Sequence, residues 1–266
     1  MLTGAGVTAP GLGVHELSVR FGGLLAVDSV TLEAPLGRLT GLIGPNGAGK
    51  TTTFNACSGL NRPTSGSVSL FGQDVTRLAP HARAQRGLGR TFQRMELFDS
   101  LTVRANVGLG CEGVMAGSRP WKFLRASRAE RSRISAATEE AMESCDVTSL
   151  AHRRPASLST GQRRLVELAR VVAGGFQMLL LDEPSSGLDR NETGRFGEIL
   201  RQLVAQGRGI LIVEHDMELV MSCCDYLHVL DFGRQIFDGT PEQVRGSDLV
   251  RAAYLGSEAA ESAASS

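Results

Sequence analysis

Residues 39–52 read LTGLIGPNGAGKTT and carry the strongest structural signal in the chain. The eight positions from Gly44 to Thr51 match the phosphate-loop pattern G-x-x-x-x-G-K-[ST] in full. Glycines let the backbone curl so that successive N–H groups point inward at an anion, and the positive end of the following helix adds to the attraction. The apolar run before the loop and the helical pattern after it supply the strand–loop–helix context that the motif requires. We therefore expect the phosphates of a nucleotide to bind here.

The side chains of this loop have separate chemical tasks. Lys50 supplies a mobile positive charge for β- and γ-phosphate oxygens, Thr51 offers its hydroxyl to Mg²⁺, and Thr52 adds another oxygen nearby. The residues expected to bind ATP at the loop are Gly44, Pro45, Asn46, Gly47, Ala48, Gly49, Lys50, Thr51 and Thr52. Kinases, GTPases, helicases and transport ATPases share such loops, so the loop alone names no reaction. The chain contains no NKxD guanine-reading segment, which argues against a GTPase.

A second apolar run, MLLLDEP at 178–184, ends in two carboxylates. In phosphate-loop ATPases the strand-end aspartate helps to position Mg²⁺, so we expect Asp182 to act there. The next residue, Glu183, is then placed to polarise the attacking water as a general base. Adjacent strand residues point to opposite sides, which separates the two tasks. Without the phosphate loop, a solvated or helix-capping pair of acids would be the preferred interpretation.

The run GILIVEH at 209–215 ends a further expected strand with a histidine. A lone histidine at a strand end is usually structural. Here it closes the third strand of what we expect to be one sheet, at the edge where the γ-phosphate should lie. We therefore expect His215 to contact the γ-phosphate and to position water.

The composition is that of an ordinary globular protein: 266 residues, 42% hydrophobic and 21% charged, with a formal net charge of zero. Zero net charge argues against a large nucleic-acid surface, so no nucleic-acid partner is expected. No apolar run approaches the roughly 18–20 residues that span a bilayer, and the N-terminus lacks the basic and apolar regions of a signal peptide. The five cysteines contain no CxxC pair, which indicates reduced, buried thiols.

Short apolar runs alternate with helical patterns along most of the chain, which predicts βαβ units and a parallel sheet. Two hairpins are expected, one turned at a Gly-Gly pair after VHELSVRF and one turned at Gly233. A region at about 95–160 has no strand-like run and is expected to be a helical insertion; its basic stretch 119–133 fits a solvated helix face or a contact with lipid or a partner. Flexible tails are expected at 1–12 and 257–266.

The segment LSTGQ at 158–162 looks like a helix start and resembles the signature motif of ABC-type ATPases. The other motifs occur in that family's order: the phosphate loop at 44–52, Gln93 in RTFQ, LLLDEP, SGLD and His215. The resemblance covers roughly residues 13–256. It implies an α/β fold: a P-loop NTPase (RecA-like) core with an antiparallel β subdomain and a helical ABC-specific subdomain, together forming an ABC ATPase domain over 13–256.

The resemblance also implies roles for residues that the local patterns do not explain. Two such domains would pair head to tail and sandwich two ATP molecules, so that Ser159, Gly161 and Gln162 would bind ATP held by the partner. Gln93 would join the core to the helical insertion and contact Mg²⁺ or water, and Phe21 would stack on adenine, with a plain core phenylalanine as the alternative. The implied catalytic residues are Glu183, His215 and Gln93, and the implied metal-binding residues are Thr51, Gln93 and Asp182. Thr160 departs from the glycine found in many signatures.

A narrower resemblance links the chain to the ATPase subunits of branched-chain amino-acid importers. It rests on RFGGLLAVDSV, GRTFQRMELFDSLTVRANV, VEHDMELVM, GTPEQVR and AAYLG. It implies a peripheral position on the cytoplasmic face of the inner membrane. The implied partners are a second ABC ATPase subunit, identical or homologous, and a transmembrane permease gripped near Gln93 and residues 94–106, with a solute-binding protein as an indirect partner. ATPases of urea or amide uptake and of lipopolysaccharide export share parts of the pattern, whereas a non-transport ABC ATPase or a small-molecule kinase fits it less well.

Overall fold

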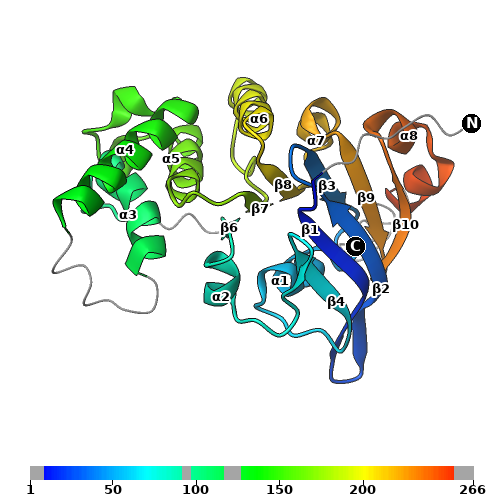
Figure 1. The fold of residues 1–266 in the computed structure, drawn as a ribbon. Helices are drawn as coiled ribbons and strands as arrows, with labels where there is room; N and C mark the ends of the chain where they lie inside the picture. Colours follow the sequence, from blue (N-terminus) through cyan, green and yellow to red (C-terminus); the bar gives the residue numbers. More distant parts are fainter. Residues whose placement is uncertain (1–8, 92–96, 117–126, 255–266) are drawn as a thin grey trace, which may run out of the picture.

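The computed structural model describes residues 9–91, 97–116 and 127–254, which form two β-sheets and a set of helices (Figure 1). The smaller sheet is antiparallel, with the strand order β2-β1-β4-β5. Its strands are β1 (Leu12–Phe21), β2 (Leu24–Ala34), β4 (Ser65–Leu70) and β5 (Gln73–Asp74). The first two strands form the expected hairpin, which turns at Gly22 and Gly23.

The larger sheet has six strands in the order β10-β9-β3-β8-β7-β6. These strands are β3 (Leu39–Ile43), β6 (Leu88–Arg90), β7 (Met178–Asp182), β8 (Gly209–Val213), β9 (Tyr226–Asp231) and β10 (Arg234–Gly239). All neighbours pair in parallel except β10, which closes the second expected hairpin against β9. Because β8 lies between β3 and β7 and all three are parallel, the carboxyl ends of these strands meet at one edge of the sheet.

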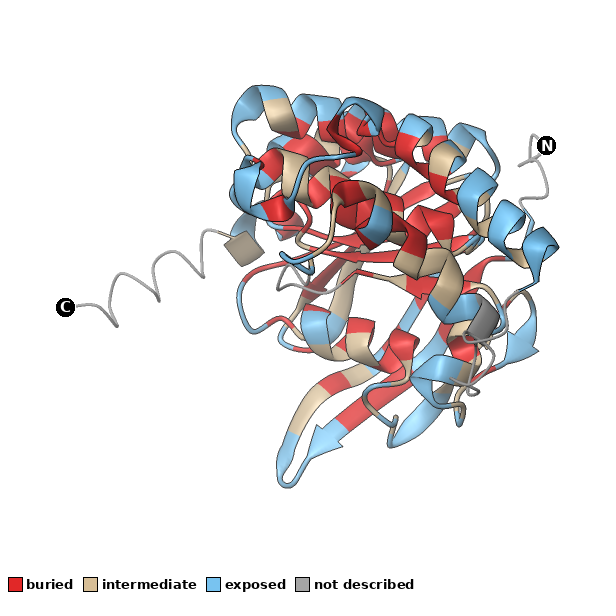
Figure 2. Ribbon diagram, turned by 90° about the vertical axis from the view of Figure 1, so that its left-hand side faces the viewer, coloured by how far each residue is buried: buried red, intermediate tan, exposed pale blue. Residues whose placement is uncertain are grey.

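Both faces of the larger sheet are covered, which explains why its central strands are buried at every position and mostly apolar. In β7, Met178 and Leu180 belong to one apolar cluster, which they share with α1 and the antiparallel sheet. Leu179 and Leu181 point the other way, into a cluster that helices α5, α6 and α7 help to form. Alternate side chains of one strand therefore hold two layers together, and the buried residues in Figure 2 follow the sheet between exposed helix faces.

The helices fall into a core set and a separate group. They are α1 (Lys50–Ser58), α2 (Pro80–Ala84), α3 (Val103–Ala116), α4 (Arg128–Ser144), α5 (Thr160–Ala173), α6 (Arg190–Ala205), α7 (Met217–Cys223) and α8 (Pro241–Gly246), with short 3-10 turns η2 (Thr148–Leu150) and η3 (Pro155–Ser157). Helices α3, α4 and α5 pack on one another at one end of the molecule (Figure 1). None of the helices within the described ranges is long and apolar enough to cross a membrane.

Two sequence-based boundaries differ from the structure. The N-terminal tail was expected to reach residue 12, but Leu12 is the first residue of β1 and is fully buried, and the carbonyl of Ala9 already accepts a hydrogen bond from the Leu36 N–H. The helical insertion was expected to end near residue 160, but α5 starts there and continues to Ala173. Its packing against α3 and α4 explains the difference, because the apolar face of α5 completes the helical group.

Several sequence-based expectations concern residues outside the described ranges. These are Gln93, the remainder of 92–96, the part of the basic stretch within 117–126, and residues 1–8 and 255–266. The described part of the basic stretch, Arg128–Arg133, lies at the start of α4 and is largely exposed.

Candidate functional site

The phosphate loop connects β3 to α1, and its glycines are required by their backbone conformation and, at Gly44 and Gly49, also by packing. Gly44, Gly47 and Gly49 have φ angles of 147°, 77° and 93°, a region that other residues rarely adopt. A Cβ atom at Gly44 would lie 2.1 Å from the carbonyl oxygen of Leu230, and one at Gly49 would lie 2.8 Å from that of Ala26. Substitution at either position would therefore force the loop away from the strands that support it.

The start of α1 is open to an anion. Its N-cap residue, Gly49, provides no side-chain hydrogen bond, whereas α5 and α6 both begin with a complete capping box. The first N–H groups of a helix have no intrahelical partner, so those of α1 point into the loop. Lys50 lies across the loop: its Nζ donates to the carbonyl oxygens of Gly44 (2.6 Å) and Pro45 (2.9 Å). This set of donors fits the phosphates of a nucleotide.

Two opposing effects act on the pKa of Lys50. Removal from water lowers the pKa of Lys50, and the carboxylate of Glu183 opposes that shift. Both side chains line the same cavity, so the carboxylate favours the charged form of the ammonium group against the effect of burial.

A cavity of about 460 Å³ opens above the loop. Its lining comes from four places in the sequence: the β1–β2 hairpin, the phosphate loop, the acidic end of β7 and the β9–β10 turn. The lining residues are Phe21, Leu24, Leu25, Ala26, Asn46, Gly47, Ala48, Gly49, Lys50, Thr51, Thr52, Glu183, Phe232 and Gly233. Phe21 is 51% exposed, so it is not a core phenylalanine. The volume lies in the usual range for a small-ligand pocket.

Asp182 is the last residue of β7 and is buried, with 4% of its surface exposed. Burial raises the pKa of its carboxyl group, and the neighbouring guanidinium of Arg90 opposes the shift. Arg90 Nη2 donates to Asp182 Oδ2 at 3.2 Å, and its guanidinium also lies 4.6 Å from the ring centre of Phe54. A buried carboxylate at the end of β7 supplies the kind of oxygen ligand that Mg²⁺ prefers. Sequence reasoning gave Arg90 no role, because only β6–β7 pairing brings it to Asp182.

Glu183 has a backbone conformation that a non-glycine residue rarely adopts, with a φ of 44°. Its N–H donates to the Val213 carbonyl at 2.9 Å, which anchors the residue to β8. The side chain lines the cavity and is 27% exposed, and its Oε1 lies 3.9 Å from Nδ1 of His215. The structure thus brings two of the expected catalytic side chains together beside the phosphate loop.

Glu214 is a functional candidate that sequence reasoning missed. Its carboxylate has no exposed surface and accepts hydrogen bonds from the N–H groups of Ser185 (2.7 Å), His215 (3.2 Å) and Asp216 (3.4 Å). Burial raises its pKa. The residue therefore ties the segment after Glu183 to the segment that carries His215. A charged residue inside the apolar run GILIVEH was the signal that could have identified it.

The signature segment, residues 158–162, lies away from the phosphate-loop cavity. Ser159 is the N-cap of α5, as expected for a helix start: its Oγ accepts from the N–H of Gln162 at 3.2 Å, and its N–H donates to Gln162 Oε1 at 3.1 Å. A Cβ at Gly161 would lie 2.4 Å from the carboxylate of Glu192 on α6. The Cγ2 of Thr160 faces Gly187 of the SGLD segment. No residue of 158–162 lines the cavity at the phosphate loop, although all five are described.

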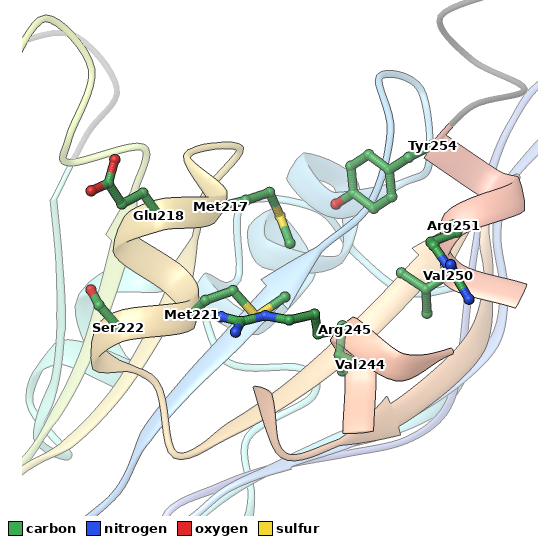
Figure 3. A pocket seen from close by; sticks show the side chains of 9 residues that line it. All are labelled: Met217, Glu218, Met221, Ser222, Val244, Arg245, Val250, Arg251 and Tyr254. Atoms are coloured by element: carbon green, nitrogen blue, oxygen red, sulfur yellow. The ribbon is translucent and has the colours of Figure 1, made fainter. Parts of the chain in front are cut away.

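A second cavity, of about 720 Å³, lies between α7 and the helical residues near the C-terminal end of the described chain (Figure 3). Its residues are Met217, Glu218, Met221, Ser222, Val244, Arg245, Val250, Arg251 and Tyr254. Met217 and Tyr254 point toward one another across it. The lining is largely apolar, and no metal-type cluster of His, Cys, Asp and Glu occurs among the residues described. The phosphate-loop cavity, by contrast, combines the glycine-rich loop with the Lys50 ammonium group and the Glu183 carboxylate.

Two family models match the chain. The model of the ABC transporter family matches residues 27–186, which contain the phosphate loop, the signature segment and the acidic strand end. The model described as branched-chain amino acid ATP-binding cassette transporter matches residues 234–260.

Curated relatives match almost end to end. The high-affinity branched-chain amino acid transport ATP-binding protein BraF of Pseudomonas aeruginosa is 38% identical over 260 residues, covering 94% of this chain and 99% of the relative. LivG of Escherichia coli, which has the same description, is 37% identical over 253 residues with equal coverage. A crystal structure of the ADP conformation of an ATP-binding cassette of an ABC transporter is 28% identical, with a TM-score of 0.80 and coverage of 94% of this chain and 100% of that one. The expected fold class is thereby confirmed.

Proposed function

The chain belongs to the ABC transporter family of ATP-binding proteins, and from this membership we propose that it hydrolyses ATP to energise the uptake of branched-chain amino acids. One structural observation carries the chemistry: the phosphate loop, Glu183 and His215 meet at one edge of the six-stranded sheet. The solute class rests on the C-terminal match at 234–260 and on two relatives named for branched-chain amino acid transport.

Each group at this edge has a proposed task. Lys50 and the first N–H groups of α1 bind the phosphates, while Thr51 and Asp182 hold Mg²⁺, which when bound neutralises charge on the phosphate oxygens. Gln93 is proposed as a further Mg²⁺ or water contact. Glu183 accepts a proton from the attacking water, and His215 orients that water against the γ-phosphate.

The signature segment is proposed to act on a partner's ATP. Ser159 and Thr160 are exposed and lie away from the chain's own cavity, which supports head-to-tail pairing with a second ABC ATPase subunit. In that dimer Ser159, Gly161 and Gln162 would complete the site across the interface. Closure around nucleotide then drives the permease between conformations, because contacts made only in the closed dimer have a free energy that the open form lacks.

A permease contact is proposed on the segment before α3. Phe98 is 55% exposed, yet its backbone is held by Asn106, whose side chain accepts from the Phe98 N–H at 2.8 Å and donates to the Phe98 carbonyl at 3.1 Å. An exposed aromatic side chain on a hydrogen-bonded backbone suits a hydrophobic contact with a short helix of the permease. The subunit would thus sit peripherally at the cytoplasmic face of the membrane, with a solute-binding protein acting through the permease.

Substitution of Glu183 tests the proposed reaction. Glu183→Gln should retain ATP and lower steady-state ATP hydrolysis by about 10²–10⁴-fold, the usual contribution of a general base. Glu198→Gln, at an exposed position of α6, is the matched control and should keep normal turnover. Normal hydrolysis by Glu183→Gln would reject the assignment of Glu183 as the base.

Reconstitution of the transporter tests which class of solute it takes up. The chain should be purified with its permease and binding protein in vesicles, and ATP hydrolysis measured with leucine, isoleucine, valine, urea or lipopolysaccharide. Stimulation by the three amino acids supports the proposal. Stimulation by urea or lipopolysaccharide alone would assign the subunit to amide uptake or lipopolysaccharide export instead.

A further inference from the structure

Phe232 is the most exposed large apolar side chain among the described residues, with 89% of its surface in contact with solvent. A single exposed apolar residue on a protein surface needs no special explanation. Phe232, however, lines the phosphate-loop cavity, together with Phe21 and Leu24, which are 51% and 67% exposed. Three exposed apolar side chains from two separate hairpins therefore gather at one nucleotide-sized opening.

The backbone around Phe232 is fastened to the phosphate loop. Phe232 and Gly233 form the β9–β10 turn with φ angles of 42° and 79°, and a positive φ is unusual for a bulky residue. The Gly233 N–H donates to the Ala48 carbonyl at 3.1 Å, and the Gly233 carbonyl accepts from the Asp28 N–H at 2.8 Å. Arg234 Nη2 pairs with Asp28 Oδ2 at 2.7 Å. The turn thus holds a fixed place beside the loop and keeps the ring out of the core.

The cavity offers different chemistry at its two ends. Backbone N–H groups and Lys50 serve the phosphates at the loop, whereas the rings of Phe21 and Phe232 offer only apolar faces and edges. The base is the planar aromatic part of a nucleoside triphosphate, and its π-faces stack on aromatic side chains without regard to hydrogen-bond pattern, whereas the ribose is non-planar and carries hydroxyl groups. Two aromatic side chains on one cavity therefore fit a base better than they fit ribose or phosphate.

We propose that Phe232 is a second base-contacting residue of the ATP site, which works with Phe21 to hold the nucleobase. This inference rests on the proposed function of the phosphate loop as an ATP site. It adds a specificity-determining residue from the β9–β10 turn, more than two hundred positions along the chain from Phe21.

Binding of two ligands separates the contribution of the base from that of the phosphates. ATP and inorganic tripolyphosphate, which has no base, are titrated into the full chain by calorimetry. Phe232→Ala should weaken ATP binding by about fivefold or more and leave tripolyphosphate binding unchanged, since one base–aromatic contact is worth about that factor. Phe232→Tyr should restore the affinity for ATP, because it keeps the ring. Leu249→Ala, at an exposed apolar position (54%) outside the cavity lining, is the control.

Fluorescence gives a second readout. The chain has one tryptophan, Trp121, so Phe232→Trp in a Trp121→Phe background places a single reporter at the cavity. ATP should quench this reporter and tripolyphosphate should not. Equal quenching by both ligands, or none by ATP, would overturn the proposed contact.

The remaining outcomes are distinct. If Phe232→Ala binds ATP as tightly as the unmodified protein, the inference is wrong while the ATP site stands. If Phe232→Ala loses affinity for ATP and for tripolyphosphate equally, the β9–β10 turn supports the phosphate loop and does not contact the base. If only ATP-dependent dimerisation is lost, Phe232 belongs to a subunit interface. If the unmodified protein binds neither ligand, the proposed function itself fails.

Discussion

The hydroxyl of Ser159 donates a hydrogen bond of 3.1 Å to the carboxylate of Glu192. The two residues lie in the first turns of neighbouring helices, α5 and α6, and Glu192 also accepts from the N–H of Asp189 at 3.2 Å. The same carboxylate packs against Gly161. An acidic side chain of this chain thus lies at the helix start where a partner's γ-phosphate is proposed to bind, and a phosphate there would meet a like charge.

Removal of this charge should favour the nucleotide-bound dimer. In a Glu183→Gln background, which holds ATP, Glu192→Gln should lower the ATP concentration needed for dimerisation by about two- to fivefold, the usual worth of one charge at a helix terminus. The effect should shrink at high salt because the contact is partly exposed. Size-exclusion chromatography over an ATP series measures it, with Glu198→Gln as the control. A higher ATP requirement in Glu192→Gln would mean that Glu192 supports the signature segment instead of competing with the phosphate.

The buried pair of Arg90 and Asp182 should matter for stability as well as for metal binding. Arg90→Met keeps apolar contact with Phe54 but leaves a buried carboxylate without its cation, which typically costs about 3–5 kcal/mol. Adding Asp182→Asn should recover part of that loss, because the second change removes the unpaired charge. Urea unfolding of the two single variants and the double variant completes the cycle. Additive losses would show that the two side chains are not coupled.

Phe98 should be needed for assembly with the permease. Phe98→Asp places a charge on the exposed surface that Asn106 holds in position, so co-purification with the permease should fall by about tenfold or more, as expected for loss of an aromatic contact site. Leu60→Ala, at an apolar position of similar exposure (52%), should assemble normally. Retained co-purification of Phe98→Asp would move the permease contact to another surface.

His228 should make stability depend on pH. It lies on β9 with 5% of its surface exposed, Nε2 is 3.3 Å from the Glu33 carbonyl, and burial lowers its pKa although Asp238 opposes the shift. Since the unfolded chain then takes up a proton more readily than the folded protein, stability falls as the pH drops below the ordinary value of about 6.5 toward the lower folded value.

The His228→Gln variant isolates this effect. The difference in unfolding free energy between the unmodified protein and His228→Gln should shrink between pH 7 and pH 5, with a slope of at most about 1.4 kcal/mol per pH unit. The exposed His152 provides a control, because His152→Gln should show no such slope. A constant difference for His228→Gln across this range would contradict the assigned direction.

Local sequence patterns were sufficient for those features that depend on neighbouring residues. The phosphate loop from Gly44 to Thr51, the acidic end of β7 and the capped start of α5 are each formed within one short segment. The residues that sequence reasoning missed depend on separate segments: Arg90 reaches Asp182 through β6–β7 pairing, and Glu214 binds Ser185 across two strand ends. The type of a residue and its spacing along the chain do not indicate which residue of a distant segment it will contact.

The sequence by itself therefore determined the motifs, their order and the strand ends on which they lie, because glycine conformation, helix capping and apolar runs are local properties. Only the tertiary structure decided that the signature segment contacts Glu192, and that Phe232 joins Phe21 at one cavity. Those relationships follow from the order in which strands pair and from the packing of helices on the sheet. Both are set by the burial of the whole apolar core and not by any single segment.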